Sequence, residues 1–175
     1  EACTLAWNFL TKTMKIPRDH LFVSYFGGNS EVPEDTETRQ IWRRIGVPDS
    51  SIRPMSDSHF FALNKSRYGP AAVSTQIHHK MLQNSCLWNI DFTNYMRHRD
   101  GRVVEMDTMH VDTGMRLEDL ACVVQGVPSV YEIDLFRPII RKIEQKYHGR
   151  CGADQGNLDY SFRVVADSVR FQIVT

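Results

Sequence analysis

The 175-residue chain lacks several features that mark particular classes of protein. It has no apolar run of the roughly 20 residues that a membrane-spanning helix needs. No signal peptide, internal repeat or low-complexity segment is visible. Its 21 basic and 21 acidic residues give a net charge of zero, which argues against a strongly basic nucleic-acid module but not against a local basic patch.

Cysteine is also scarce, and the pattern offers no metal site. The cysteines are Cys3, Cys86, Cys122 and Cys151. They lie far apart with no CxxC pair, so we expect reduced thiols in a reducing compartment and no zinc site. His78 and His79 are adjacent, but neighbouring residues on a strand point to opposite faces, so one ion should not bind both.

What is present indicates part of one ordinary domain. Hydrophobic residues make up 42% of the chain, enough for a real core. "EACTLAWNFL" is already helical in pattern, with Leu5, Phe9 and Leu10 at core spacing. "SFRVVADSVRFQIVT" stops in mid-pattern without a cap. We therefore expect an interior fragment of a longer protein, with any targeting sequence outside it.

Hydrophobic periodicity predicts alternating helices and strands, with residues 49–72 irregular. The predicted helices are 2–14, 33–46, 116–125 and about 134–147, and the predicted strands are 20–26, 73–81, 87–96 and 102–106. Asp100-Gly101 predicts a hairpin, Gly46 and Gly126 are expected to end helices, and Asp134 to cap one. Strands joined mostly by hairpins, with helices at the edges, indicate an α+β domain around an antiparallel sheet.

The same patterns predict which side chains are buried. On strand 87–96 we expect Trp88, Ile90, Phe92 and Met96 on one face and Asn89, Asp91 and Thr93 on the other. The helix at 116–125 should pack through Leu117, Leu120, Ala121 and Val124. Ile41, Trp42 and Ile45 form the stripe of the second helix, and Leu135 and Phe136 join the predicted core.

The stretch "HVDTGMRLEDL", residues 110–120, reads as a strand end, a glycine turn and then a helix. Such a turn beside an acid suits a nucleotide, yet its helix side carries Arg116 and Asp119. From the residues alone, Asp112 either binds a ligand or caps the following helix. For Asn89, on the polar face of its strand, the residues alone indicate an ordinary exposed strand position.

At this point the motifs are specific enough to compare with a family. The stretches "SYFGGN", "ETRQIWRRIGVP", "YGPAAVSTQIHHK", "WNI…HVDTGM…YEIDLF" and "DYSFRVVADSVR" occur in order along nearly the whole chain. They resemble the catalytic domain of the alanyl-tRNA synthetase family, a class II aminoacyl-tRNA synthetase. "HVDTGM…QG" is closer to mitochondrial members, which favours a mitochondrial over a cytoplasmic location.

The resemblance implies a fold and a reaction. The fold is an antiparallel sheet with flanking helices, and residues 1–175 would be part of one aminoacylation domain that begins after motif 2 and so lacks motifs 1 and 2. In the reaction, alanine attacks the α-phosphate of ATP with Mg²⁺, and the alanyl group passes to alanine tRNA. The tRNA-binding region and the editing domain with its zinc would lie outside this segment.

The resemblance also implies an alanine site. Asp112 stands where the family's acid binds the alanine ammonium, and Gly114 where backbone must approach the ligand. Asn89 matches a position that faces the pocket, and Phe61 stands where the family has a pocket tryptophan.

Several positions of the ATP site depart from the family pattern. Arg116 replaces a glycine beside the adenine, and Asp119 replaces the motif 3 arginine that holds the γ-phosphate. An acid there turns attraction into repulsion, and one charge pair at about 4 Å is worth roughly 4 kcal/mol at an effective dielectric of about 20. We expect Arg116 to pair with Asp119 at i,i+3 instead of replacing the lost arginine.

Further departures lie in the loop "GPAAVSTQ" and the last segment. Both family cysteines, the second Gly-Pro and an acid are missing from that loop, and Gln76 takes the place of the acid. Lys80 replaces another acid, "KSRY" adds about two residues, and Ser168 replaces a histidine while Asp167 and Arg170 remain.

These observations leave three hypotheses. The chain is a piece of an active alanine–tRNA ligase, a catalytically dead paralogue that acts as a tRNA- or protein-binding scaffold, or a translation without selected function. A kept core with an altered ATP site favours the second hypothesis over the third. The same alteration counts against normal ATP use, so we predict an impaired ATP site in a family aminoacylation domain.

Overall fold

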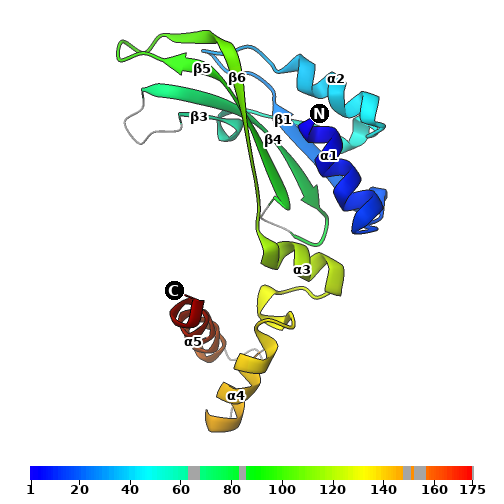
Figure 1. Ribbon diagram of the computed structural model, residues 1–175, viewed down its shortest axis with the longest axis vertical. Coiled ribbons are helices and arrows are strands. Elements are labelled where there is room, and N and C mark those ends of the chain that lie inside the picture. Colours follow the sequence, from blue (N-terminus) through cyan, green and yellow to red (C-terminus); the bar gives the residue numbers. More distant parts are fainter. Residues whose placement is uncertain (63–67, 83–85, 148–150, 152–156, 175) are drawn as a thin grey trace. The chain divides into compact units, whose positions relative to one another are not determined.

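The computed structural model describes residues 1–62, 68–82, 86–147, 151 and 157–174 (Figure 1). The chain divides into two compact units, Glu1–Leu120 and Ala121–Thr175, and each is described by itself. Among the described residues, no helix has both the length and the apolar character to cross a bilayer. The assignment of residues 1–175 to part of one aminoacylation domain stays a prediction.

A six-stranded sheet forms the centre of the first unit (Figure 1). Its strands are β1 (Leu21–Phe26), β2 (Ile52–Met55), β3 (Phe60–Ala62), β4 (Gly69–His79), β5 (Trp88–Arg97) and β6 (Val103–Met115). The order is β2-β1-β4-β5-β6, and β3 also pairs with β4. Every pair is antiparallel except β1–β2, which is parallel. The predicted α+β fold around an antiparallel sheet is confirmed, with this one parallel pair added.

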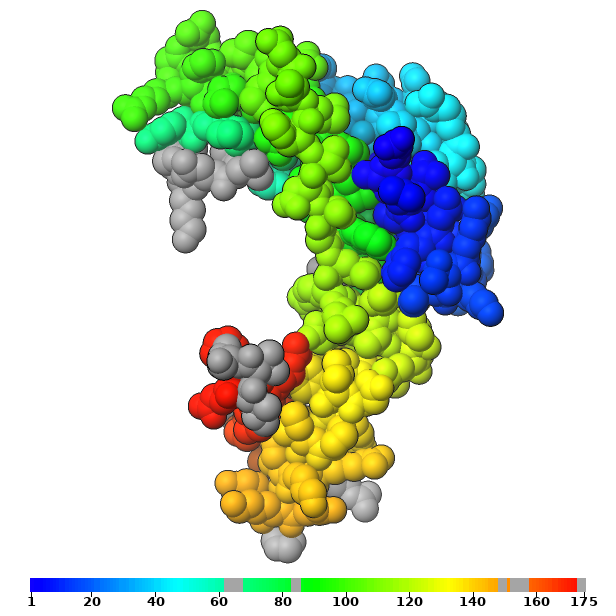
Figure 2. Space-filling view, viewed as in Figure 1, coloured from blue at the N-terminus to red at the C-terminus, as the bar shows by residue number. Residues whose placement is uncertain are grey.

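Two helical segments cover the apolar face of the sheet. They are α1 (Ala2–Asn8), continued by a π-helical turn at Phe9–Thr13, and α2 (Thr36–Ile45). Trp42 is fully buried, and its Nε1 donates to Thr75 Oγ1 on β4 at 2.8 Å. Phe9 meets the Trp88 ring edge-on at 5.5 Å between centroids. The helices form adjacent blue and cyan surfaces in Figure 2.

The ends of these helices follow local chemistry. The Asp35 side chain accepts from the Thr38 N–H at 3.0 Å and so caps α2, and Gly46 ends it with φ +95°, which favours glycine. Leu10, in the π-helical turn after α1, is buried as expected. On α1, Leu5 is exposed, and Cys3, Ala6 and Trp7 are buried in its place. The prediction for Leu5 is wrong because the buried side of the helix is centred on other residues.

Replacing Asp35 tests whether its side chain stabilises the start of α2. We expect Asp35→Ala to lower the free energy of unfolding by about 1 kcal/mol, because the Thr38 N–H loses its acceptor. Asp35→Asn keeps a side-chain acceptor and should cost less. Urea unfolding followed by circular dichroism measures both, and equal losses for the two variants would contradict the capping role.

The region expected to be irregular, residues 49–72, contains two complete strands, β2 and β3, and the start of β4. These strands are too short to show a clear alternating pattern in the sequence. β2 has four residues, one of them Pro54, and β3 has three. Pro54 is tolerated because β2 is an edge strand. The "KSRY" addition lies mostly outside the described residues.

Two details of β5 and β6 correct the predicted pattern. A bulge near Thr93 shifts the alternation on β5, so that Tyr95, and not Met96, packs with Phe92 against the cluster around Phe60. Gly114 lies inside β6, opposite Asn89, and not in a turn. The predicted glycine turn is wrong because the ladder to β5 keeps the chain extended as far as Met115.

Three helices follow: α3 (Leu117–Gln125), which spans the boundary of the units, and α4 (Arg137–Tyr147) and α5 (Asn157–Val174). Shorter 3₁₀ turns lie at Arg18–His20, Asp49–Ser51, Asp57–His59 and Val130–Glu132. Gly126 follows α3 with φ +66°, as expected for a helix end. The core prediction fails for Leu117, Val124 and Leu135, which are exposed, and holds for Leu120 and Phe136. Asp134 does not cap α4, because its side chain accepts from Gln125.

Candidate amino-acid site on the polar face of the sheet

The strand register places most of the predicted site residues on one face of the sheet. Gln76, Asn89 and Gly114 form one row across β4, β5 and β6. Directly opposite residues point to the same side of a sheet, so these three share a face. That face is opposite to the one covered by α1 and α2, because Thr75 and Trp88, their neighbours along the strands, contact those helices.

The neighbouring rows add the other two residues of the predicted alanine site. Ser74, Asp91 and Asp112 form the next row, and Ala72 lies opposite Thr93 in the row beyond. Phe61 of β3 pairs with Ala72, so its ring lies on the same polar face and is 37% exposed. The structure therefore brings together the positions that the resemblance assigned to alanine.

The structure excludes one of the structural roles that the sequence left open for Asp112 and for Asn89. Asp112 lies within β6, its Oδ1 accepts from the Thr113 N–H at 2.8 Å, and α3 begins only at Leu117. It therefore does not cap that helix. Asn89 is partly buried, and its Nδ2 donates to Asp91 Oδ2 at 2.8 Å, so it is not an ordinary exposed strand residue. A Cβ added at Gly114 would meet open space.

Sequence reasoning placed Asp91 on the polar face but gave it no role. Asp91 is only 8% exposed, and its Oδ1 has no hydrogen-bond partner among the described residues. Burial raises the pKa of this carboxyl, the hydrogen bond from Asn89 lowers it, and the charge of Asp112 raises it again. Hydrophilic alternation on β5 was the signal available, but a buried carboxylate without a full set of partners could be seen only in the structure.

Arg116 and Asp119 form the ion pair that the sequence predicted. Arg116 Nη2 donates to Asp119 Oδ1 at 3.0 Å, and Nε lies 2.9 Å from Oδ2 without hydrogen-bond alignment. The Asp119 side chain is 3% exposed, whereas that of Arg116 is 67% exposed. The acid at the motif 3 position is thus buried and held by the cation one helical turn before it.

The Cys86 thiol connects this ion pair to the polar face. Burial is the main cause that raises the pKa of this thiol. The charges of Asp119 and Asp91 also raise it, whereas the charge of Arg116 lowers it. Arg116, Asp119 on α3 and Asp91 on β5 therefore all act on the pKa of this one thiol.

A second polar cluster lies farther along the same face, and sequence reasoning did not find it. Ser24 Oγ is 2.7 Å from His59 Nε2 and 2.8 Å from His78 Nε2. The pKa of His78 falls to about 4, chiefly through burial and then through the charges of His59 and Arg53. His79 points to the other face, where it packs against His20, as the alternation predicted. Among the described side chains, no group of three or more His, Cys, Asp or Glu is arranged to hold a metal ion.

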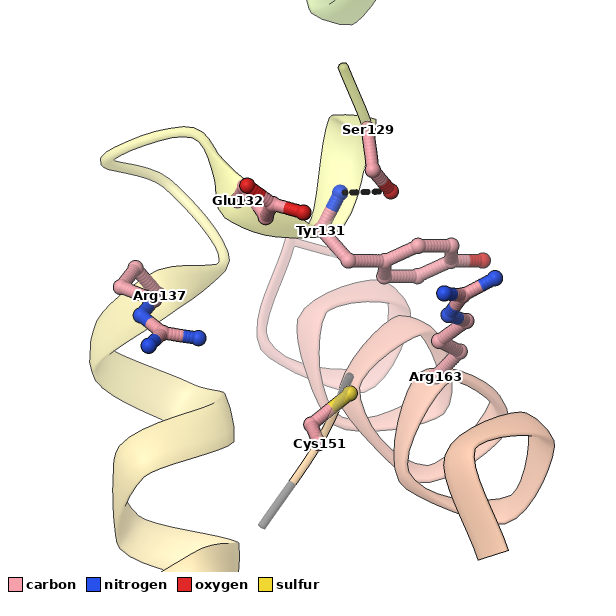
Figure 3. A pocket seen from close by; sticks show the side chains of 6 residues that line it. All are labelled: Ser129, Tyr131, Glu132, Arg137, Cys151 and Arg163. Atoms are coloured by element: carbon pink, nitrogen blue, oxygen red, sulfur yellow. Dashed lines mark hydrogen bonds between the residues drawn. The ribbon is translucent and has the colours of Figure 1, made fainter. Parts of the chain in front are cut away.

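The second unit contains a cavity of about 340 Å³ (Figure 3). It is lined by Ser129, Tyr131, Glu132, Arg137, Cys151 and Arg163. The Arg163 guanidinium lies over the Tyr131 ring, 5.4 Å from its centroid, and the Tyr131 hydroxyl donates to Asp167 at 2.7 Å. Asp167 thus has a structural partner, and none of the predicted alanine- or ATP-site residues lines this cavity.

Comparison with known proteins agrees with the resemblance. The family described as "tRNA synthetases class II (A)" matches residues 1–175. The chain is 40% identical to the mitochondrial alanine–tRNA ligase of Mus musculus over 97% of its own length. It is 33% identical to the mitochondrial enzyme of Saccharomyces cerevisiae and 32% identical to the cytoplasmic enzyme of Drosophila melanogaster. It spans about a fifth of the length of these relatives. The chain therefore belongs to the class II tRNA synthetases of the alanine type, as the motifs predicted.

Proposed function

We propose that this chain is the amino-acid-binding part of an alanine–tRNA ligase aminoacylation domain in which the alanine side is kept and the ATP side is impaired. The observation that carries the alanine side is the shared face of Asn89, Asp112 and Gly114. A carboxylate binds an ammonium group, an amide orients it, and a bare glycine leaves room for the ligand. Phe61 supplies an apolar wall on the same face.

The observation against normal ATP use is the Arg116–Asp119 pair. Motif 3 of the family holds the γ-phosphate with an arginine, whereas this position carries a buried carboxylate. The charge of Arg116 is taken up by Asp119, and Gln76 offers an uncharged amide where the family has an acid that could balance a cation. These residues do not fit ATP and its Mg²⁺ well, so we derive no step of alanine activation through them.

Calorimetry of the full-length protein tests both halves of the proposal. We expect alanine to bind measurably and ATP with Mg²⁺ to bind much more weakly than to a typical alanine–tRNA ligase. ATP-dependent pyrophosphate exchange at an ordinary rate would contradict an impaired ATP site. Absence of alanine binding by the folded protein would contradict the alanine side.

The double replacement Arg116→Gly with Asp119→Arg should restore nucleotide affinity. A guanidinium returned to the motif 3 position regains a charge-assisted bond to phosphate, which we expect to strengthen ATP binding roughly tenfold to a hundredfold. Both changes are needed together, because an arginine at the buried position 119 would otherwise lie beside a second cation, Arg116.

A matched control is available in the pair formed by Arg43 and Asp49, which lie on and just after α2. Arg43→Gly with Asp49→Arg makes the same formal change in charge away from the polar face and should leave ATP affinity unchanged. If the two double variants gain ATP affinity equally, the effect comes from net charge and not from the motif 3 position.

A second candidate function is a catalytically dead paralogue that binds alanine tRNA or a protein. It is favoured by the closed Arg116–Asp119 pair, which gives α3 an internal partner in place of a ligand. Tight tRNA binding by the full-length protein together with no ATP binding, even after the double replacement, would support this candidate over the impaired enzyme.

We also propose a mitochondrial location, since the chain is 40% identical to a mitochondrial relative and 32% identical to a cytoplasmic one. Imaging the tagged full-length protein beside a mitochondrial marker tests this proposal, and a diffuse cytoplasmic signal would contradict it.

A further inference from the structure

Asp91 is the residue of the polar face that the proposed function leaves unexplained. It lies directly opposite Asp112, and two like charges at directly opposite positions repel each other. It is also more than nine-tenths buried, where an ionised carboxylate is costly unless its oxygens are bonded. Asn89 supplies one donor, to Oδ2, and leaves Oδ1 without a partner among the described residues.

The unsatisfied atoms around Asp91 are all acceptors or hydroxyls. Asn89 Oδ1 and Ser74 Oγ are buried and, among the described residues, also lack a partner. Ser74 is 1% exposed and lies directly opposite Asp91 on β4. Buried polar groups are normally paired, so a cluster of unmatched acceptors at one place indicates a ligand with several donors.

We propose that Asp91 is a second carboxylate of the alanine site, which shares the ligand's ammonium group with Asp112 and Asn89 Oδ1. An ammonium group has three N–H donors and no acceptor, and these three side chains offer one acceptor each. The positive charge also removes the repulsion between the two facing carboxylates. This inference rests on the proposed function, because it uses the alanine side of the site.

The ligand chemistry is that of a primary ammonium and not of a metal ion. These two neighbouring rows offer the carboxylates of Asp91 and Asp112 and the neutral oxygens of Asn89 and Ser74. Among the described residues, no third acid, histidine or cysteine joins them in a metal-binding group. The unequal burial also suits an amino acid, because exposed Asp112 can receive the ligand first while Asp91 lies deeper.

The test is Asp91→Asn in the full-length protein, with alanine binding measured by calorimetry. The amide keeps the shape and can still accept from Asn89, but it cannot pair with an ammonium as an anion. We expect alanine to bind roughly tenfold to a hundredfold more weakly, the usual range for a hydrogen bond to a charged group. L-lactate has a hydroxyl in place of the ammonium group. Measured by competition, its affinity for the Asp91→Asn variant should equal its affinity for the unaltered protein.

Stability separates this role from a structural one. Without alanine, Asp91→Asn should melt at the same or a higher temperature, because it removes a buried charge facing Asp112. Glu105→Gln, an exposed acid on β6 opposite Tyr95, is the matched control and should change neither quantity. Unchanged alanine affinity in Asp91→Asn would overturn the inference, as would an affinity loss accompanied by a lower melting temperature or shared by L-lactate. If the unaltered protein binds no alanine, the proposed function itself fails.

Discussion

Replacing Trp42 with alanine is expected to lower the free energy of unfolding by about 3–5 kcal/mol. Among the described residues, Trp42 is the largest fully buried side chain. It joins α2 to the sheet and packs edge-to-face with the Trp7 ring, with 6.0 Å between the centroids. Its Nε1 donates to Thr75 Oγ1, which in turn donates to the backbone oxygen of Ser24 at 2.6 Å. Truncation therefore leaves a large cavity and also removes one bond from a buried chain of hydrogen bonds.

Trp42→Phe separates the two contributions. The phenylalanine ring fills most of the cavity but cannot donate, so we expect a loss of about 1–2 kcal/mol from the broken bond to Thr75. Urea unfolding followed by tryptophan fluorescence and circular dichroism measures both variants. A loss below about 1 kcal/mol for Trp42→Ala would mean that the sheet does not depend on α2 for its apolar cover.

Trp42 also shows which part of the fold follows from the sequence. Its burial was predicted from helical spacing, because an amphipathic helix has a single apolar stripe and Trp42 lies at its centre. The faces of β5 followed in the same way from alternation, as far as Thr93. Beyond that residue the prediction failed, since a bulge depends on the partner strand and leaves no local signal.

Gly114 shows why part of the candidate site was misread. Glycine next to Asp and Thr is a strong turn signal when taken alone, yet pairing with Asn89 keeps it extended within β6. The resemblance assigned Gly114 to the alanine site, which stays a prediction, and gave no information on its backbone conformation. Pairing with β5 thus overrides the local turn propensity of this glycine.

Two other parts of the polar face could not be predicted from local pattern. Ser24, His59 and His78 meet across 35 and 54 residues of sequence, a distance over which periodicity carries no information. Asp91 was assigned to the correct face, but its burial and its unmatched oxygen depend on β4 and β6, which flank it. Strand register, and not residue type, brings these scattered polar residues together on one face of the sheet.

The Ser24 cluster should make the fold sensitive to acid. His78 has a pKa of about 4 in the folded chain, below the value of roughly 6.5 expected for an unfolded one. The unfolded state therefore takes up the proton first, and stability is lost as the pH falls through about 6.5 toward 4. The lowered pKa of His59, also caused by burial, acts in the same direction.

The size of this loss can be bounded and measured. The His78 shift corresponds to at most about 3 kcal/mol of unfolding free energy between neutral pH and pH 4. The glutamine of His78→Gln cannot titrate, so the stability of this variant should fall less over this pH range. The difference between its pH profile and that of the unaltered chain separates the effect of the imidazole from that of the carboxylates.

His98→Gln, at the exposed β5–β6 hairpin, is the control and should leave the pH profile of stability unchanged. Identical profiles for His78→Gln and the unaltered chain would mean that His78 stays open to solvent, and its stacking on Phe22 at 4.7 Å and bond to Ser24 would then not form in solution.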